Sequence, residues 1–101
     1  MYAMTGKLSA QPGKRGELAE ILLRASKMVS GIQGCRAYII LEDVADDSAV
    51  WVFKMWDDKE AHDASLRDEK VRALIGEAMP MLAGAPSGSE LRVLGGHGIN
   101  I

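Results

Sequence analysis

The stretch Val50-Trp51-Val52-Phe53-Lys54-Met55-Trp56 decides the fold, because all but one of its residues are apolar. Successive side chains of a β-strand point to opposite faces. One face therefore carries Trp51, Phe53 and Met55, and the other carries Val50, Val52 and Trp56, with Lys54 as the exception. We expect a strand with two apolar faces, unlike the half-wet strands of most antiparallel sheets.

The segment before this strand predicts its hairpin partner. Residues 35–42 are rich in Tyr, Ile and Leu, as is typical of a strand. The polar turn Asp46-Asp47-Ser48 separates the two strands by only a few residues. A connection this short favours antiparallel pairing.

The segment after the strand predicts two helical pieces. Asp57-Asp58 offers a side-chain cap for a helix that runs to Leu66. Apolar residues return at helical spacing from Val71 to Leu82, and Pro80 should kink or end that helix near its last turn. The polar residues 67–70 lie between the two pieces.

The N-terminal part also predicts a strand followed by a helix. Residues 1–10 predict a short strand, which Gln11-Pro12-Gly13 breaks. Apolar residues from Lys14 to Val29 recur at spacings of three, four and seven, which indicates an amphipathic helix. Glycines follow this helix, as they commonly do at a helix C-terminus.

The C-terminal part predicts one more strand. Residues 83–89 contain Gly and Pro and predict a loop, whereas residues 90–94 predict a strand. In the tail, Ile99 and Ile101 can pack against other apolar groups. The order strand, helix, strand, strand, helix, strand predicts one α+β domain over residues 1–101, of the ferredoxin-like βαββαβ kind with an antiparallel sheet.

This arrangement also predicts a homodimer. The two helices of a βαββαβ unit cover only one face of the sheet. The other face carries large apolar side chains on the middle strands, and a patch of that size is seldom left in water. A second copy related by a two-fold axis is the simplest cover.

Composition limits the partners that the sequence favours. The 101 residues carry a net charge of −2 without a basic block, so we expect no nucleic-acid partner. The apolar runs are too short to span a bilayer and the N-terminus does not resemble a secretory signal, so we expect no membrane partner. Cys35 is the sole cysteine, which suits a cytoplasmic location.

Several short motifs together resemble a known family. They are Pro12-Gly13 after the first strand, Gly34-Cys35 with Tyr38 in the second, Trp56 at the end of the third, the run Asp57 to His62, and Ser65-Leu66 followed by Val71 to Leu74. In order and spacing the chain resembles the antibiotic biosynthesis monooxygenase family. These are small dimeric α/β-barrel proteins that include quinol monooxygenases.

The resemblance implies a site in each subunit, between the sheet and the helices. Family members of known activity oxidise electron-rich aromatics such as quinols or anthrones with O2, without flavin or metal. The substrate's own carbanion reduces oxygen, and the protein holds, deprotonates and shields the substrate. On this basis we expect no cofactor and no metal.

The chain departs from the family pattern at three positions. Many members carry a His where this chain has Ser65, and another near Lys70. Haem-degrading members carry an aromatic residue at the Ser65 position and an iron-binding His where this chain has Ile75. The resemblance therefore disfavours haem ligation by that route.

His62 is the candidate catalytic residue. An imidazole titrates near neutrality, which suits a base that removes a phenolic proton. The competing interpretation is an exposed or capping histidine on an acidic helix, beside Glu60 and Asp63. His97 lies among glycines and is expected to face solvent.

The candidate substrate-binding residues are Tyr38, Trp51, Trp56 and Ser65. The three aromatics can line an aromatic pocket, although such residues more often fill a core or a dimer contact. A serine within a helix can bond a substrate oxygen or simply be small. Three functions stay open: a cofactor-independent monooxygenase, a non-catalytic small-molecule binding protein, and a structural dimer module. A pocket containing His62 or Tyr38 favours the first.

Overall fold

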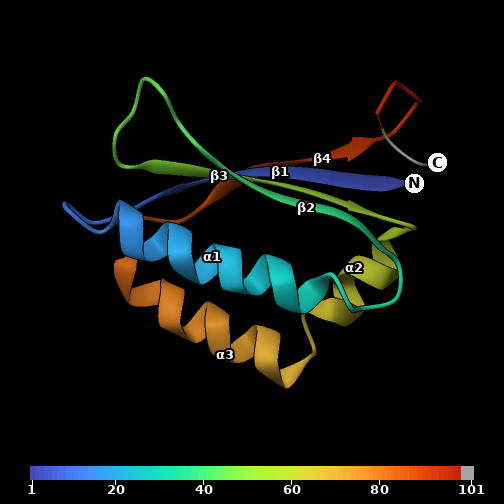
Figure 1. The fold of residues 1–101 in the computed structure, drawn as a ribbon, viewed down its shortest axis with the longest axis horizontal. Helices are drawn as coiled ribbons and strands as arrows, with labels where there is room; N and C mark the ends of the chain where they lie inside the picture. The colour runs from blue at the N-terminus through green and yellow to red at the C-terminus, as the bar shows by residue number, and fades with distance from the viewer. Residues whose placement is uncertain (99–101) are drawn as a thin grey trace.

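The computed structural model describes residues 1–98, which contain a four-stranded sheet. The helices lie on one side of this sheet (Figure 1). The elements in chain order are β1 (Tyr2–Ser9), α1 (Arg15–Val29), β2 (Cys35–Glu42), β3 (Ala49–Trp56), α2 (Lys59–Ser65), α3 (Glu69–Ala78), the 3-10 helix η1 (Met79–Met81) and β4 (Ser87–Arg92). This order confirms the predicted βαββαβ arrangement. The second helical connection is divided into α2, α3 and η1.

The strand order is β2-β3-β1-β4, and each neighbouring pair is antiparallel. The register places Thr5 of β1 opposite Phe53 of β3, and Phe53 opposite Ile39 of β2. Residues directly opposite one another point to the same face, so these three side chains lie together. The predicted hairpin of residues 35–56 is therefore confirmed.

Aspartate caps begin both helices of the second connection. Asp58 Oδ1 accepts a hydrogen bond from the Ala61 amide at 2.8 Å. Asp68 Oδ1 accepts from the Lys70 amide at 2.8 Å and from the Val71 amide at 3.2 Å. These amides have no partner inside their own helices, so the caps fix where α2 and α3 begin.

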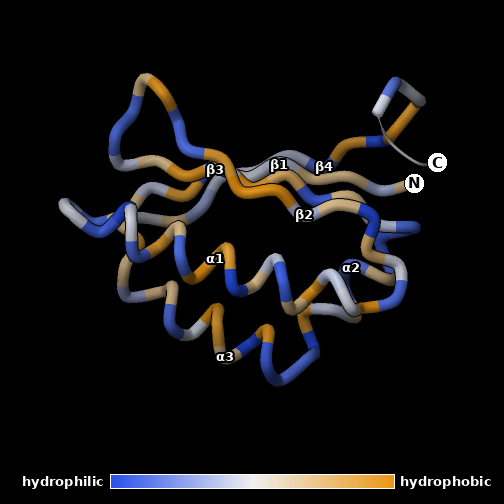
Figure 2. Tube along the Cα trace, in the orientation of Figure 1, coloured by the Kyte–Doolittle hydropathy of each residue, from blue (hydrophilic) through white to orange (hydrophobic). Residues whose placement is uncertain are grey.

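The core lies between the helices and one face of the sheet. The buried residues of α1 recur at helical spacing: Leu18, Ile21, Leu22, Ala25 and Val29. All but Val29 join Val50 and Val52 of β3 in one cluster, and Val29 packs with Trp56 and Val71 in a second. Figure 2 shows polar residues alternating with apolar ones along α1 and α3, and apolar stretches along β2 and β3.

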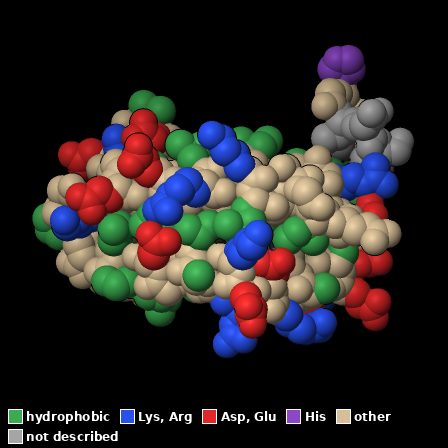
Figure 3. Space-filling model, turned by 60° about the horizontal axis from the view of Figure 1, so that its bottom comes forward, with side chains coloured by type: hydrophobic (Ala, Val, Ile, Leu, Met, Phe, Trp, Pro, Cys, Tyr) green, Lys and Arg blue, Asp and Glu red, His purple; other side chains and the backbone are tan. Residues whose placement is uncertain are grey.

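The outer surface of the helix layer is charged. Figure 3 shows Lys and Arg side chains interspersed with Asp and Glu over this face, with apolar side chains between them. Ion pairs such as Arg24 with Glu77, at 3.1 Å, join α1 to α3 there. In the described part of the chain, no helix is long and apolar enough to cross a membrane.

The last strand differs from its predicted position. β4 covers Ser87–Arg92 rather than residues 90–94, so the expected loop contributes half of the strand. Gly88 pairs with Gly6, and a Cβ on Gly88 would lie 2.9 Å from the Thr5 carbonyl oxygen. Close approach to β1 therefore makes a strand of residues that have little strand propensity themselves. Ile99 and Ile101 lie outside the described residues.

The two faces of the sheet are both apolar, as predicted, but only one is covered. Val50, Val52 and Trp56 of β3 lie buried beneath the helices. The opposite face carries large side chains that stay exposed: Ile39, Leu41, Trp51 and Leu91. These four residues, together with Phe53, are called the open face below.

Candidate functional site

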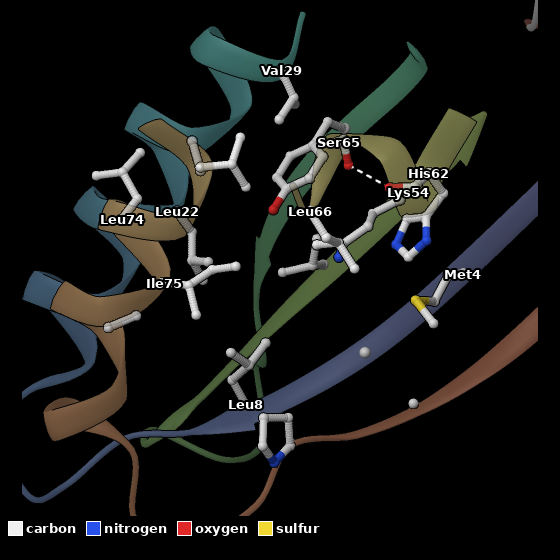
Figure 4. Close-up of a pocket in the computed structure, with 18 of the residues that line it drawn as sticks. Met4, Leu8, Leu22, Val29, Lys54, His62, Ser65, Leu66, Leu74 and Ile75 are labelled. Carbon is white, nitrogen blue, oxygen red and sulfur yellow. Dashed lines mark hydrogen bonds between the residues drawn. The ribbon is translucent and has the colours of Figure 1, made fainter. Parts of the chain in front are cut away.

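A cavity of 360 Å³ lies between the covered face of the sheet and the helices. Its walls come from β1, β2 and β3 above and from α1, α2 and α3 below, as Figure 4 shows for a part of its lining. Most of the wall is aliphatic, with Leu8, Leu22, Leu74 and Ile75 among its members. An apolar cavity with few polar groups is typical of a site for a small organic molecule.

His62 projects into this cavity from α2 and is only 5% exposed. Its Nδ1 lies 3.0 Å from Oδ1 of Asp63. An ionised carboxylate can only accept, so Nδ1 is the donor in this contact. In the neutral imidazole, Nε2 then carries the lone pair. That nitrogen is buried and has no hydrogen-bond partner in the described part of the chain.

Trp56 presents a second buried nitrogen at the cavity. The side chain is 1% exposed, and its Nε1 donor has no hydrogen-bond partner among residues 1–98. The Trp56 and His62 rings meet edge to face with their centres 6.0 Å apart, and the Tyr2 ring lies 5.3 Å from His62 on another side. Buried polar atoms without partners are costly and rare, so two of them at one cavity make it the candidate functional site.

Tyr38 and Lys54 complete the polar lining. Burial raises the pKa of Tyr38 to about 12, so its phenol is neutral at physiological pH. The Lys54 Nζ lies 5.6 Å from the centre of the Tyr38 ring, within the range of a cation–π contact. Burial also lowers the pKa of Lys54, because desolvation disfavours the ammonium form.

Ser65 lines the cavity one turn after His62. Its hydroxyl donates to the His62 carbonyl oxygen at 2.6 Å, shown as the dashed line in Figure 4. The hydroxyl proton is therefore engaged within α2. Only the oxygen lone pairs of Ser65 are left to meet a ligand.

A glycine contact sets the position of α2 against the sheet. Gly34 has a φ of +92°, and a Cβ built on it would lie 2.7 Å from the Ala61 Cβ. Its carbonyl oxygen accepts from the Asp57 amide at 2.8 Å. The turn before β2 thus touches α2 directly, and this contact helps to place His62 at the cavity.

The structure brings together four of the five predicted site residues. His62, Tyr38, Trp56 and Ser65 all line the cavity. Trp51 differs from its expected place, because strand alternation puts it on the open face, where Nε1 donates to Asp43 Oδ2 at 2.8 Å. His97 is exposed, as predicted.

The sequence interpretation missed Lys54 as a site residue. The signal was present, since Lys54 is the one charged residue in an otherwise apolar strand. Ile75, which stands where haem-degrading relatives are expected to carry histidine, also lines the cavity. Within residues 1–98, no three His, Cys, Asp or Glu side chains gather as a metal site.

The fold and the cavity define a ferredoxin-like α+β protein with an apolar cavity between its sheet and its helices. The model of the antibiotic biosynthesis monooxygenase family matches residues 1–77. The chain therefore belongs to the antibiotic biosynthesis monooxygenase family. This membership supports a role in oxygenation or in small-molecule binding.

Solved structures agree with this assignment. A protein from Chloroflexus aurantiacus that is assigned as an antibiotic biosynthesis monooxygenase is 35% identical, with 98% of each chain covered and a TM-score of 0.88. A protein from Deinococcus radiodurans with the same assignment is 22% identical over 100% of this chain and 98% of its own, with a TM-score of 0.82, which supports the fold alone. Among curated proteins, none matches this chain.

Proposed function

We propose that this protein is a cofactor-independent monooxygenase that oxidises a small electron-rich aromatic, of the quinol or anthrone type, with O2. The observation that carries the proposal is the buried, unpartnered Nε2 of His62 in an otherwise apolar cavity. A base needs a lone pair aimed at the substrate, and the Asp63 contact favours that tautomer.

The proposed reaction begins with proton transfer. His62 Nε2 takes the proton of a phenol, or the acidic proton of an anthrone, and leaves an electron-rich anion. This anion passes an electron to O2, and the two radicals combine to form a C–O bond. Loss of water then gives the product: one oxygen atom enters the aromatic, the other leaves as water, and the substrate supplies all the electrons.

The cavity wall supports such chemistry. Trp56 and Tyr38 offer aromatic surfaces for a planar ring, and the aliphatic residues of α1 and α3 exclude water from a reduced-oxygen intermediate. The neutral phenol of Tyr38 and the Trp56 N–H are both donors, suited to a substrate oxygen.

We further propose that the protein works as a homodimer joined through the open face. The large exposed side chains of this face lie on three strands of one sheet, away from the cavity. An apolar sheet face of this kind is a natural isologous interface. Each subunit would then keep its own cavity on the helix side.

An oxygen-electrode assay tests the catalytic proposal. Metal-stripped protein is offered a panel of quinols and anthrones, and oxygen uptake is recorded. We expect uptake with at least one member, and His62→Ala should lower the rate by about 10²-fold, as is usual for the loss of a general base.

Two controls accompany this variant. His97→Ala removes an exposed histidine and should keep the wild-type rate. His62→Gln replaces the buried ring by a polar side chain, and its melting curve and dimer content separate loss of the base from loss of the fold. Full activity in His62→Ala would remove His62 from the mechanism. Binding without oxygen uptake by the wild type would favour a small-molecule binding protein.

A further inference from the structure

Lys54 occupies an unusual place for a cation. It lies in the middle of β3, where the register sets it opposite Met4 of β1 and Tyr38 of β2. All three residues line the cavity, and Figure 4 shows Lys54 extending into it from the strand. The ammonium group therefore belongs to the cavity and not to the outer surface of the sheet.

The remaining cations of the chain differ from Lys54. Across residues 1–98, each of the others is either exposed to solvent or paired with a carboxylate. Lys54 is partly buried, and no Asp or Glu of this part of the chain lies within ion-pair distance of its Nζ. The Lys54 ammonium instead contacts the face of the Tyr38 ring.

Such a placement has a physical cost. A buried ammonium loses hydration, and an aromatic face replaces only a part of it. A negatively charged oxygen in the cavity would supply the missing partner, and a charge-assisted hydrogen bond to it would be strong because water is excluded. The orphaned nitrogens of His62 and Trp56 line the same cavity and could approach the same ligand.

We propose that Lys54 binds an acidic oxygen of the ligand, so that the cavity selects aromatic molecules bound as oxyanions. This inference rests on the proposed function and sharpens its substrate class. In the reaction, His62 removes the proton and Lys54 holds the resulting phenolate or enolate oxygen. The aliphatic and aromatic walls then take up the ring system.

Calorimetric titration with matched probes tests this selection. Naphthoate and naphthamide share one ring system and differ in charge, and a nitronaphthol ionised at neutral pH is compared with its methyl ether. We expect the wild type to prefer each anion over its neutral partner by roughly tenfold or more. A preference for the nitronaphtholate alone assigns the site to phenolates, and a preference for naphthoate alone assigns it to carboxylates.

Three variants test whether Lys54 causes the preference for anionic probes. Lys54→Met should bind anion and neutral probe equally, with the affinity for naphthamide unchanged. Lys54→Arg should keep the preference, and Lys70→Met, which removes an exposed lysine of α3, should behave as the wild type. Unchanged selectivity in Lys54→Met, or a wild type that does not prefer either anion, would overturn the inference.

This result is separable from the catalytic test. If the preference for anionic probes depends on Lys54 but no oxygen uptake occurs, the proposed monooxygenase activity is refuted and anion binding by Lys54 stands. Oxygen uptake that depends on His62 but is indifferent to Lys54→Met would refute the anion site and retain the oxygenase.

Discussion

The two faces of the sheet are built from the same strands but differ in what surrounds them. On the covered face, β3 presents Val52, Lys54 and Trp56 to a cavity that holds buried polar groups without partners. On the open face, it presents Trp51 and Phe53, and Trp51 Nε1 has already found a partner in Asp43. The two faces are alike in apolar character and differ in hydrogen bonding, because within residues 1–98 buried polar atoms lack partners only on the covered face. This difference is the reason to propose chemistry at the covered face and association at the open face.

Association through the open face can be broken with one charge. Ile39 of β2 is 49% exposed, and Ile39→Glu would put a carboxylate within the proposed interface of both copies. Burying unpaired charges is costly, so we expect the dimer Kd to rise by roughly 10²-fold or more, which is about 3 kcal/mol. Light scattering coupled to gel filtration reads the mass directly.

Leu23 supplies the matched control for this variant. It is also 49% exposed but lies on α1, in the helix layer on the other side of the sheet. Leu23→Glu should therefore leave the dimer intact. A wild type that is monomeric at micromolar concentration, or an Ile39→Glu variant that stays dimeric, would refute the open face as the interface.

Substitutions in the core beneath the covered face should change the stability of the fold instead of the dimer Kd. Leu18 of α1 is 0% exposed and belongs to the main core cluster. Leu18→Ala should lower the free energy of unfolding by about 3 kcal/mol, because it removes apolar burial and leaves a cavity. Leu23→Ala, in the same helix but exposed, should change it by about 0.5 kcal/mol or less. Denaturant unfolding measures both, and equal effects would contradict the core assignment.

The smallest expected effect is the change in folding stability when Lys54, the cation in the cavity, is replaced. Burial lowers the pKa of Lys54 below its ordinary 10.5, so the folded state disfavours the charged form at neutral pH. This penalty disappears as the pH rises through the lowered pKa toward 10.5, where the unfolded chain also loses the proton. Lys54→Met should therefore be more stable than the wild type by about 1 kcal/mol at neutral pH, with a smaller difference at alkaline pH.

Urea unfolding at several pH values measures this difference. Lys70→Met gives the baseline for removing an exposed lysine. A Lys54→Met variant less stable than the wild type would show that the ammonium is already stabilised within the fold.

Most of the fold could be predicted from local patterns. The nearly continuous apolar run along residues 50–56 and the helical spacing of apolar residues along residues 14–29 both reflect burial, so the sequence shows these two elements directly. Residues 87–89, of the sequence Ser-Gly-Ser, have no such pattern. They form a strand because β1 offers an unpaired edge, and a contact between distant parts of the chain is invisible to local reasoning.

The residue types of the candidate site could be predicted, but the face of the sheet on which each side chain lies could not. Trp56 lies five positions after Trp51, an odd offset, so a regular strand points the two side chains to opposite faces and cannot turn both toward the same cavity. The sequence alone does not say which face of the sheet the helices cover, so both Trp51 and Trp56 were predicted to bind substrate. Lys54 was visible as a break in the apolar pattern, but its meaning required the knowledge that its face encloses a cavity.

The contact at Gly34 limits how this site can change over generations. The atom that a new side chain would meet is the Cβ of Ala61, which is fixed to the backbone of α2 and cannot swing aside. Any descendant that keeps α2 seated on this turn must therefore keep glycine at residue 34. The position of His62 at the cavity therefore depends on a residue outside the cavity wall, which must lack a side chain.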